Sequence, residues 1–288
     1  MKNQDVYQMV TDRLIEALEA GTAPWRKPWN GEGCPAGWPT NLSTGKTYQG
    51  VNVWTLASAP FSSHYWVTFK QCQSLGGKVR KGEKAGGFVV YWNWLEKTDV
   101  ETGKPVKIPF LKYSRVFNSE QCDGLEDKIP EPKALPESDA ERMENAESTI
   151  RAYIDNGGPS FETGHQDRAF YRSSSDAVSV PILEQYETGG QYYSTVFHEL
   201  THSTGHSKRL DRGLDKLAAF GSESYSREEL IAEMGAAFLC GIHGIDSTLD
   251  NSAAYLKGWI KALKSDSKMA VWAGSRAQKA SNMILGDA

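Results

Sequence analysis

The sequence predicts an α+β protein of two domains, a small α+β domain followed by a mainly helical one. Three observations support this prediction. The first third of the chain is rich in glycine and aromatic residues and contains short alternating runs typical of strands. A charged, proline-rich segment follows, and beyond it the apolar residues mostly recur at helical spacing. We expect a first domain over residues 1–125, a linker over 126–140 and a second domain over 141–288.

The first domain should begin with an amphipathic helix that ends near Gly21. The apolar residues that recur there at helical spacing are Val6, Met9, Val10, Leu14, Ala17 and Leu18. Residues 25–117 then hold short alternating runs, such as 88–94, that predict strands. If the linker separates two independent domains, residues 1–125 should fold alone.

A linker is predicted because residues 127–138 combine three prolines with many charges. Ser138 and Glu141 fit a capping box at the start of a helix. That helix should end at residues 156–159, where Asn-Gly-Gly-Pro is a strong stop signal.

The second domain should be mainly helical. Short strands are expected around 170–172 and 177–180, before Pro181. The helices expected after them span about 190–204, 227–241, 250–264 and 267–285.

Charge distribution and cysteine content restrict the classes of protein to which the sequence can belong. Residues 1–120 contain 15 Lys and Arg against 10 Asp and Glu, a net +5, and the remainder contains 17 against 26, a net −9. This asymmetry suggests two different tasks. The four cysteines are scattered, which argues against a cysteine zinc site and a disulfide scaffold. With neither a signal-peptide pattern nor a membrane-spanning run, we expect a cytoplasmic protein that makes no membrane contact.

The second domain contains a metal-site motif, His198-Glu199-Leu200-Thr201-His202. Residues four apart share one face of a helix, so the imidazoles of His198 and His202 can bind one Zn²⁺, and Mn²⁺ or another divalent metal would also fit. Glu199 could take the proton of a water on that ion and act as the catalytic base. The neighbouring apolar residues give this helix a face to bury, which favours a metal site over a chance match.

A third ligand is expected from the next helix, where Glu229 and Glu233 share one face. We favour Glu229 as the metal ligand and Glu233 as the carboxylate that hydrogen-bonds a ligand histidine. In a rival interpretation, Ser226 and Glu229 form a capping box and Glu233 becomes the ligand. Glu228 is the weaker candidate, because it points about 100° away from Glu229.

A further histidine, His206, follows Gly205, the expected C-cap of the motif helix. Lys208 stands where a metzincin would have its third histidine, so the chain is not a metzincin. We consider two roles for His206, a catalytic one in stabilising the transition state and a structural one in holding the turn.

Aromatic and basic residues gather in the first domain, where seven of the nine tryptophans lie within the first 94 residues. Single-stranded nucleic acid is bound by such combinations, because cations contact phosphates and aromatic rings stack on bases. The candidate DNA-binding residues are Lys70, Lys78, Arg80, Lys81, Lys84, Trp92 and Trp94. In the alternative interpretation, the tryptophans form a small core and the lysines keep its surface soluble.

Several motifs together resemble the ArdC-type antirestriction proteins of conjugative plasmids, over nearly the whole chain. In the first domain the matching segments are 22–29 (TAPWRKPW), 50–54 (GVNVW), 76–84 (GGKVRKGEK) and 116–118 (VFN). In the second domain they are 198–206 (HELTHSTGH), 228–234 (EELIAEM) and 255–260 (YLKGWI).

The resemblance implies an N-terminal domain that binds single-stranded DNA and a C-terminal zincin domain similar to the SprT-like DNA–protein crosslink proteases. It thus implies a zinc metallopeptidase of the gluzincin type that protects incoming plasmid DNA from host restriction. The expected partners are single-stranded DNA and, as peptidase substrate, a restriction enzyme or a DNA-bound protein.

Two other functions remain open. One is a non-enzymatic DNA-binding antirestriction protein with a structural metal site, and the other is a free-standing metallopeptidase effector. The intact Glu199 favours hydrolysis over a purely structural metal. The basic, aromatic first domain argues against a free-standing effector.

Overall fold

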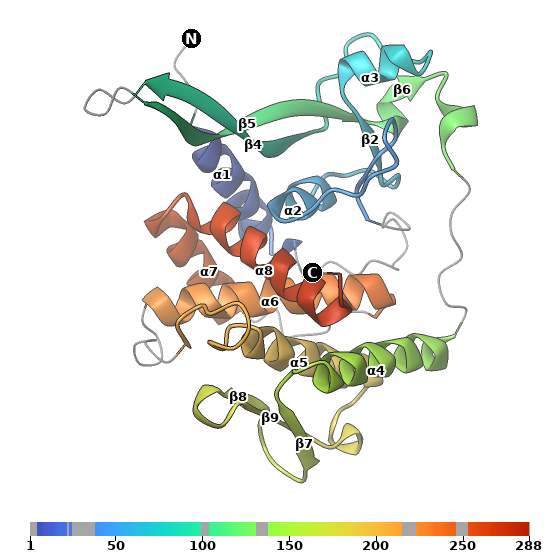
Figure 1. The fold of residues 1–288 in the computed structure, drawn as a ribbon. Helices are drawn as coiled ribbons and strands as arrows, with labels where there is room; N and C mark the ends of the chain where they lie inside the picture. Colours follow the sequence, from blue (N-terminus) through green and yellow to red (C-terminus); the bar gives the residue numbers. More distant parts are fainter. Residues whose placement is uncertain are drawn as a thin grey trace.

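Helices and sheets form three layers in this computed structural model (Figure 1). A strand-rich layer, a central group of helices and a small sheet follow one another from top to bottom. The structure describes residues 5–21, 23–24, 38–98, 104–130, 138–214, 223–245 and 253–287. Within these ranges, none of the helices is long and apolar enough to cross a membrane.

The first part of the chain contains three α-helices and six strands among its described residues. They are α1 (Val6–Glu19), β1 (Thr40–Asn41), α2 (Val51–Ala57), β2 (Tyr65–Val67), α3 (Phe69–Ser74), β3 (Lys78–Val79), β4 (Gly87–Thr98), β5 (Pro105–Asn118) and β6 (Cys122–Asp123). One sheet has the order β1-β2-β5-β4, and β3 pairs with β6. The expected helix at the N-terminus is present, and Asp5 caps it by accepting a hydrogen bond from the Tyr7 amide at 3.0 Å.

A long hairpin of β4 and β5 dominates this part. The two strands pair from Gly87↔Val116 to Thr98↔Pro105. Because side chains alternate between the faces of a strand, Phe88, Val90, Trp92 and Trp94 share one face. Val90 and Leu111 on that face join the core, whereas Trp92, which lies opposite Leu111, and Trp94 beyond it are exposed.

The second part of the chain begins with α4 (Asp139–Asp155), whose start was expected correctly. The Ser138 hydroxyl accepts a hydrogen bond from the Glu141 amide at 3.2 Å, as an N-cap does. Gly157 follows the helix with a φ of 93°, a conformation that glycine adopts without strain. Of the expected linker, residues 131–137 lie outside the described residues.

A small sheet and four helices complete the second part. The strands are β7 (Ser160–Gly164), β8 (Phe170–Arg172) and β9 (Ala177–Pro181), and the helices are α5 (Gly189–Ser203), α6 (Glu223–His243), α7 (Ala253–Ser265) and α8 (Met269–Leu285). In the sheet order β7-β9-β8, β8 is an edge strand antiparallel to β9. The strand β7 was not expected from the sequence, and α6 begins four residues earlier than expected.

The two parts share one hydrophobic core. It combines residues of α1 and α2 with residues of α6, α7 and α8, among them Leu14, Trp54 and Phe238. The ring of Phe238 stacks on Trp54 at 4.7 Å and on Trp38 at 5.3 Å between centroids. A Cβ on Gly274 of α8 would lie 2.8 Å from the Val51 amide nitrogen, so α2 and α8 are in direct contact there. This argues against independent folding of residues 1–125, and the domain boundaries themselves stay a prediction.

We expect the chain to unfold as one unit, and we expect Phe238→Ala to lower the stability of both parts together. Removing this fully buried ring should cost about 3–5 kcal/mol. Calorimetry should show one transition that moves to lower temperature as a whole. The control Phe69→Ala removes a ring that is 51% exposed and should change stability by less than about 1 kcal/mol. Two separate transitions, only one of them shifted, would contradict the shared core.

Candidate metal centre

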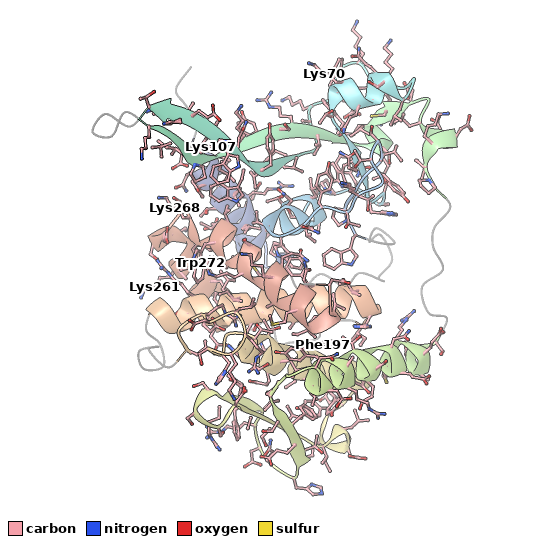
Figure 2. All side chains as sticks on the ribbon, in the orientation of Figure 1. Lys70, Lys107, Phe197, Lys261, Lys268 and Trp272 are labelled. Carbon is pink, nitrogen blue, oxygen red and sulfur yellow. The ribbon has the colours of Figure 1, made fainter. Side chains whose placement is uncertain are left out.

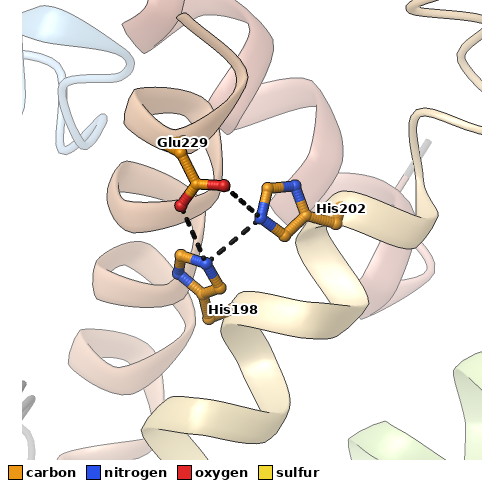
Figure 3. Close-up of side chains that lie close together, drawn as sticks. All are labelled: His198, His202 and Glu229. Carbon is orange, nitrogen blue, oxygen red and sulfur yellow. Dashed lines mark hydrogen bonds and ion pairs between the residues drawn. The ribbon is translucent and has the colours of Figure 1, made fainter. Parts of the chain in front are cut away.

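The helix α5 holds the motif histidines side by side. The Thr188 hydroxyl starts this helix by accepting a hydrogen bond from the Gln191 amide at 3.2 Å. Val196, Phe197 and Leu200 are fully buried and hold its opposite face in the core. The face that carries the motif histidines therefore points toward α6 (Figure 3).

Three side chains converge at this place, His198 and His202 of α5 and Glu229 of α6 (Figure 3). The two Nε2 atoms are 3.1 Å apart. The Glu229 carboxylate lies 3.5 Å from Nε2 of His198 and 3.4 Å from Nε2 of His202. All three ligand atoms lie within 4.8 Å of one another.

These distances suit a small divalent cation. Nitrogens that each lie about 2.0–2.1 Å from zinc in a tetrahedral site are about 3.3–3.4 Å apart. The observed separations of 3.1–3.5 Å are close to that value. Nδ1 of His198, the ring nitrogen that faces away from this position, is buried and has no hydrogen-bond partner in the described part of the chain. Two imidazoles and a carboxylate are also the donor set of many hydrolytic zinc sites.

The start of α6 decides between the two interpretations of Glu229. This helix begins at Glu223, so Ser226 lies inside it and cannot be its N-cap. The capping-box alternative therefore does not apply, and the Glu229 side chain is available to the histidines. A Cβ on Gly235 of α6 would lie 2.5 Å from Cγ2 of Thr201, so glycine there allows α6 to approach α5 closely.

Glu228, the weaker candidate for the third metal ligand in the sequence, orients one of the histidines. Nδ1 of His202 donates to Oε1 of Glu228 at 3.3 Å, while Nε2 of the same ring faces Glu229. Consecutive helical residues point about 100° apart, which is why two adjacent glutamates reach opposite edges of one imidazole. Glu233, expected in this role, is buried one turn further along, and its charge contributes to the raised pKa of His198.

Arg212 ties Glu228 to the end of α5. Its guanidinium donates to both oxygens of Glu228, at 2.6 and 3.0 Å, to the Thr204 hydroxyl at 2.7 Å and to the Thr201 carbonyl at 2.8 Å. A Cβ on Gly205 would lie 2.8 Å from this guanidinium. Gly205 thus makes room for Arg212 and has no positive φ, and the C-cap is Thr204 instead.

Burial and hydrogen bonding act in opposite directions on the protonation of these groups. Burial alone would lower the pKa of His202, but hydrogen bonds to Glu228 and Glu229 outweigh it and raise that pKa to about 10. Burial would raise the pKa of Glu229, but hydrogen bonds from His198 and His202 hold it well below its usual range. Without a metal, His202 therefore carries a proton at neutral pH.

Uptake of a divalent cation at neutral pH is expected to release a proton, because histidine binds metal only through an unprotonated nitrogen. With the His202 pKa near 10, apparent metal affinity should rise about tenfold per pH unit from neutral pH toward that value. In metal-free protein the same raised pKa stabilises the fold below the ordinary histidine value of 6.5, and this contribution is lost as pH rises through about 10. Calorimetric titration in buffers of different ionisation enthalpy measures the proton count, and a count of zero would contradict the raised pKa.

The three side chains open into a cavity of about 290 Å³. Its lining residues are Ala169, Phe170, Tyr171, Ser173, His198, Glu199, His202, Leu214, Glu228 and Glu229. Glu199 lines it without being one of the three converging ligands. The edge strand β8 forms one wall through Phe170 and Tyr171, and neither residue was expected at the site from the sequence.

His206 is not among the residues that line this cavity. Its Nδ1 accepts a hydrogen bond from the Lys208 amide at 3.2 Å and lies 3.9 Å from a carboxylate oxygen of Asp176. Arg209 donates to that carboxylate and to the Ser203 carbonyl, the latter at 2.8 Å. These contacts join the turn before β9 to the end of α5, which agrees with the structural role considered for His206.

The DNA-binding candidates lie along the top layer. Lys78 is exposed on β3 and Lys81 in the loop after it, and Lys70 is exposed on α3 at one end of the layer (Figure 2). Trp92 and Trp94 are 51% and 58% exposed on one face of the hairpin, so they are not core tryptophans. The side chain of Arg80 pairs with Glu83, Asp123 and the Glu120 carbonyl, which gives it a structural role in this loop. Lys84 is exposed in the same loop.

Two protein-family descriptions match the chain. The first, the N-terminal domain of anti-restriction factor ArdC, matches residues 4–117. The second, a zincin-like metallopeptidase, matches residues 148–276 and so includes the motif helix and α6. The matched regions correspond to the two parts described above.

Similar proteins are found among curated sequences. Two Escherichia coli proteins named DNA primase TraC are 39% and 37% identical to this chain over 97% of its length. The chain spans only 27% and 20% of those two proteins. A Sinorhizobium fredii protein named y4eC is 34% identical over 96% of this chain and 90% of its own length.

Two solved structures are similar over almost the whole chain. The metal-free structure of the antirestriction protein ArdC from plasmid R388 is 38% identical, with a TM-score of 0.79, and the comparison covers 99% of this chain and 98% of that one. The Mn(II)-bound structure of the same protein is 35% identical, with a TM-score of 0.76 over the same shares. A divalent metal therefore binds in a structural neighbour of this chain.

Proposed function

This chain belongs to the ArdC family of antirestriction proteins, with an N-terminal ArdC domain and a zincin-like metallopeptidase domain, and from this premise we propose that it binds single-stranded DNA and hydrolyses peptide bonds at a divalent metal site to protect incoming DNA from restriction. The observation that carries the proposal is the convergence of His198, His202 and Glu229 beside a buried Glu199. A purely structural metal would need the three ligands but not Glu199 on the cavity wall.

The site residues would divide the chemistry among them. His198, His202 and Glu229 would hold the cation, which when bound supplies Lewis acidity to a peptide carbonyl and to water. Glu199 is placed to accept the proton of the attacking water and to pass it to the departing amine. Glu228, fixed by Arg212, keeps the Nδ1 proton on His202 and thereby leaves Nε2 free to bind the cation.

An extended peptide is the substrate shape that suits the cavity. The edge strand β8 borders it, and among the described residues one side of this strand has no neighbouring strand. Unpaired backbone groups on an edge can pair with an extended segment of another chain. With Phe170 and Tyr171 on that strand, the wall of the cavity also offers aromatic surface to a substrate side chain.

Single-stranded DNA is the expected partner of the top layer. Exposed lysines of α3 and of the loop after β3 occupy one end, and the exposed rings of Trp92 and Trp94 lie further along β4. Since a strand advances about 3.4 Å per residue, Trp94 lies roughly 24 Å from Gly87 at the start of β4. The layer is therefore long enough to contact several nucleotides.

The test of the proposal starts with the purified chain. We expect about one divalent ion per chain, binding of single-stranded oligonucleotide, and cleavage of protein bound to it. A four-site alanine variant should weaken DNA binding and reduce the slope of log affinity against log salt by about 0.7 for each phosphate that is no longer neutralised by a lysine. The substituted residues are Lys70, Lys78, Lys81 and Lys84.

A control variant of equal charge keeps this test specific. It replaces four exposed cations of the second part by alanine, namely Arg151, Lys257, Lys261 and Lys279. If both variants weaken binding equally, the effect is one of net charge and the placement of DNA on the top layer is wrong. Single substitutions of Trp92 or Trp94 should cost about 1–3 kcal/mol per stacked base with little change in salt dependence.

A further inference from the structure

A second cavity lies at the base of the hairpin and is separate from the metal centre. It has a volume of about 220 Å³ and lies between α1, α2 and the start of β4. Its lining residues are Met9, Arg13, Thr55, Ala85, Gly86, Gly87, Phe88, Tyr113 and Arg115. We call it the hairpin-base pocket. The lining contains two arginines and no carboxylate, so it favours an anionic ligand.

The two arginines retain hydrogen-bonding capacity. The side chain of Arg115 is exposed and makes neither a hydrogen bond nor an ion pair within the described residues. Arg13 makes two long contacts, with the Ser58 carbonyl at 3.4 Å and with exposed Glu16 at 3.3 Å. A guanidinium has five donors, so both side chains can still donate to phosphate oxygens.

Aromatic rings and bare backbone form the rest of the pocket. Phe88 and Tyr113 meet edge to face, with centroids 6.4 Å apart. If Gly86 and Gly87 carried a Cβ, that atom would collide with packed side chains outside the pocket. These two glycines therefore present backbone to the pocket. Arginines beside aromatic rings are the combination that holds a nucleotide, with the phosphate on the cations and the base on the rings.

The pocket lies next to one of the two groups of DNA-binding candidates. Ala85 directly follows Lys84, the last residue of the loop 80–84 after β3, which we call the basic loop. Phe88 lies on the same face of β4 as Trp92 and Trp94, because these residues are separated by even numbers of positions. The pocket therefore adjoins the basic loop, and buried Val90 separates it from the tryptophans on this face.

We propose that the hairpin-base pocket receives one nucleotide unit of single-stranded DNA, with its phosphate on Arg13 and Arg115 and its base against Phe88 and Tyr113. This inference rests on the proposed DNA binding and extends it to a defined site. A volume of about 220 Å³ is below the usual range for drug-sized ligands, about 300–1,000 Å³, which limits the pocket to a single nucleotide unit. The pocket would hold one nucleotide of the strand beside the basic loop.

The experiment measures binding of short fluorescein-labelled oligothymidylates to the full chain by anisotropy over a range of salt concentrations. Arg115→Gln should weaken binding about tenfold and lower the salt slope by about 0.7, because one phosphate no longer meets a cation. Tyr113→Leu, which keeps apolar volume, should weaken binding with an unchanged slope. An abasic unit moved along the oligonucleotide should weaken binding at one position, and Tyr113→Leu should abolish that sensitivity. Arg151→Gln, an exposed arginine on α4, is the matched control and should bind as the unaltered chain does.

The outcomes separate this inference from the proposed function. If the unaltered chain binds the oligonucleotide but Arg115→Gln and Arg13→Gln both leave affinity and slope unchanged, the pocket assignment is wrong and DNA binding stands. If the unaltered chain binds no single strand, the proposed function fails and this inference with it. If free thymidine monophosphate binds as tightly as the oligonucleotide and depends on Arg115, the pocket serves free nucleotides, which also overturns the inference.

Discussion

Replacing Glu199 by glutamine is expected to reduce peptide hydrolysis by about 10²–10⁴-fold, the usual contribution of a general acid–base group. The variant should keep its metal, because the three converging ligand atoms belong to His198, His202 and Glu229. It should also keep its fold, since glutamine has nearly the same shape as the buried glutamate it replaces. Metal analysis, a peptidase assay on protein bound to single-stranded DNA, and DNA binding are measured in parallel.

The double variant His198→Ala/His202→Ala is the matched control and should lose both metal and hydrolysis. Hydrolysis that persists in Glu199→Gln at the level of the unaltered chain would exclude Glu199 as the base. Protection of DNA against restriction gives the second readout. If Glu199→Gln still protects DNA while the lysine variant of the top layer does not, protection depends on binding alone, and the non-enzymatic alternative is correct.

Arg212→Met should destabilise the fold by about 3–5 kcal/mol and weaken metal binding by about 10–100-fold. Both effects follow from the position of Glu228, the ion-pair partner of Arg212. The side chains of Arg212 and Glu228 are only 5% and 6% exposed, so removing the guanidinium takes the nearest cation from a buried carboxylate and leaves it only the longer hydrogen bond from His202. The same carboxylate accepts the hydrogen bond that orients His202. Chemical denaturation of the metal-free protein and metal titration measure the two effects separately.

An exposed ion pair serves as the control for this variant. In the pair of Arg151 and Glu147 on α4, the side chains are 72% and 36% exposed. Arg151→Met should therefore cost only about 0.3–0.5 kcal/mol. The double variant Arg212→Met/Glu228→Gln should recover part of the stability, because the unpaired charge is gone. If Arg212→Met costs no more than Arg151→Met, the proposed role of the buried pair is wrong.

Short-range features of this protein were readable from the sequence. The four-residue spacing of His198 and His202, the cap at Ser138 and the alternation along 88–94 each depend on a few neighbouring residues, and helix and strand geometry convert them directly into structure. Family resemblance and the two-part organisation were also correctly expected. Even so, β7 was missed and α6 was predicted to begin too late, since element boundaries carry weaker signals than their periodic interiors.

The sequence by itself thus determined that His198, Glu199 and His202 share one helix. Only the tertiary structure decided which residues of other elements complete the site around that helix. The approach of α6 brings Glu229 to the metal side of His202 and Glu228 to its other side, and Arg212 reaches Glu228 only because Gly205 leaves space. The core shared by α2 and α6 likewise arises between residues such as Trp54 and Phe238 that are far apart in the chain. Such contacts depend on how whole elements pack against one another, and the spacing of residues along the sequence carries no record of that packing.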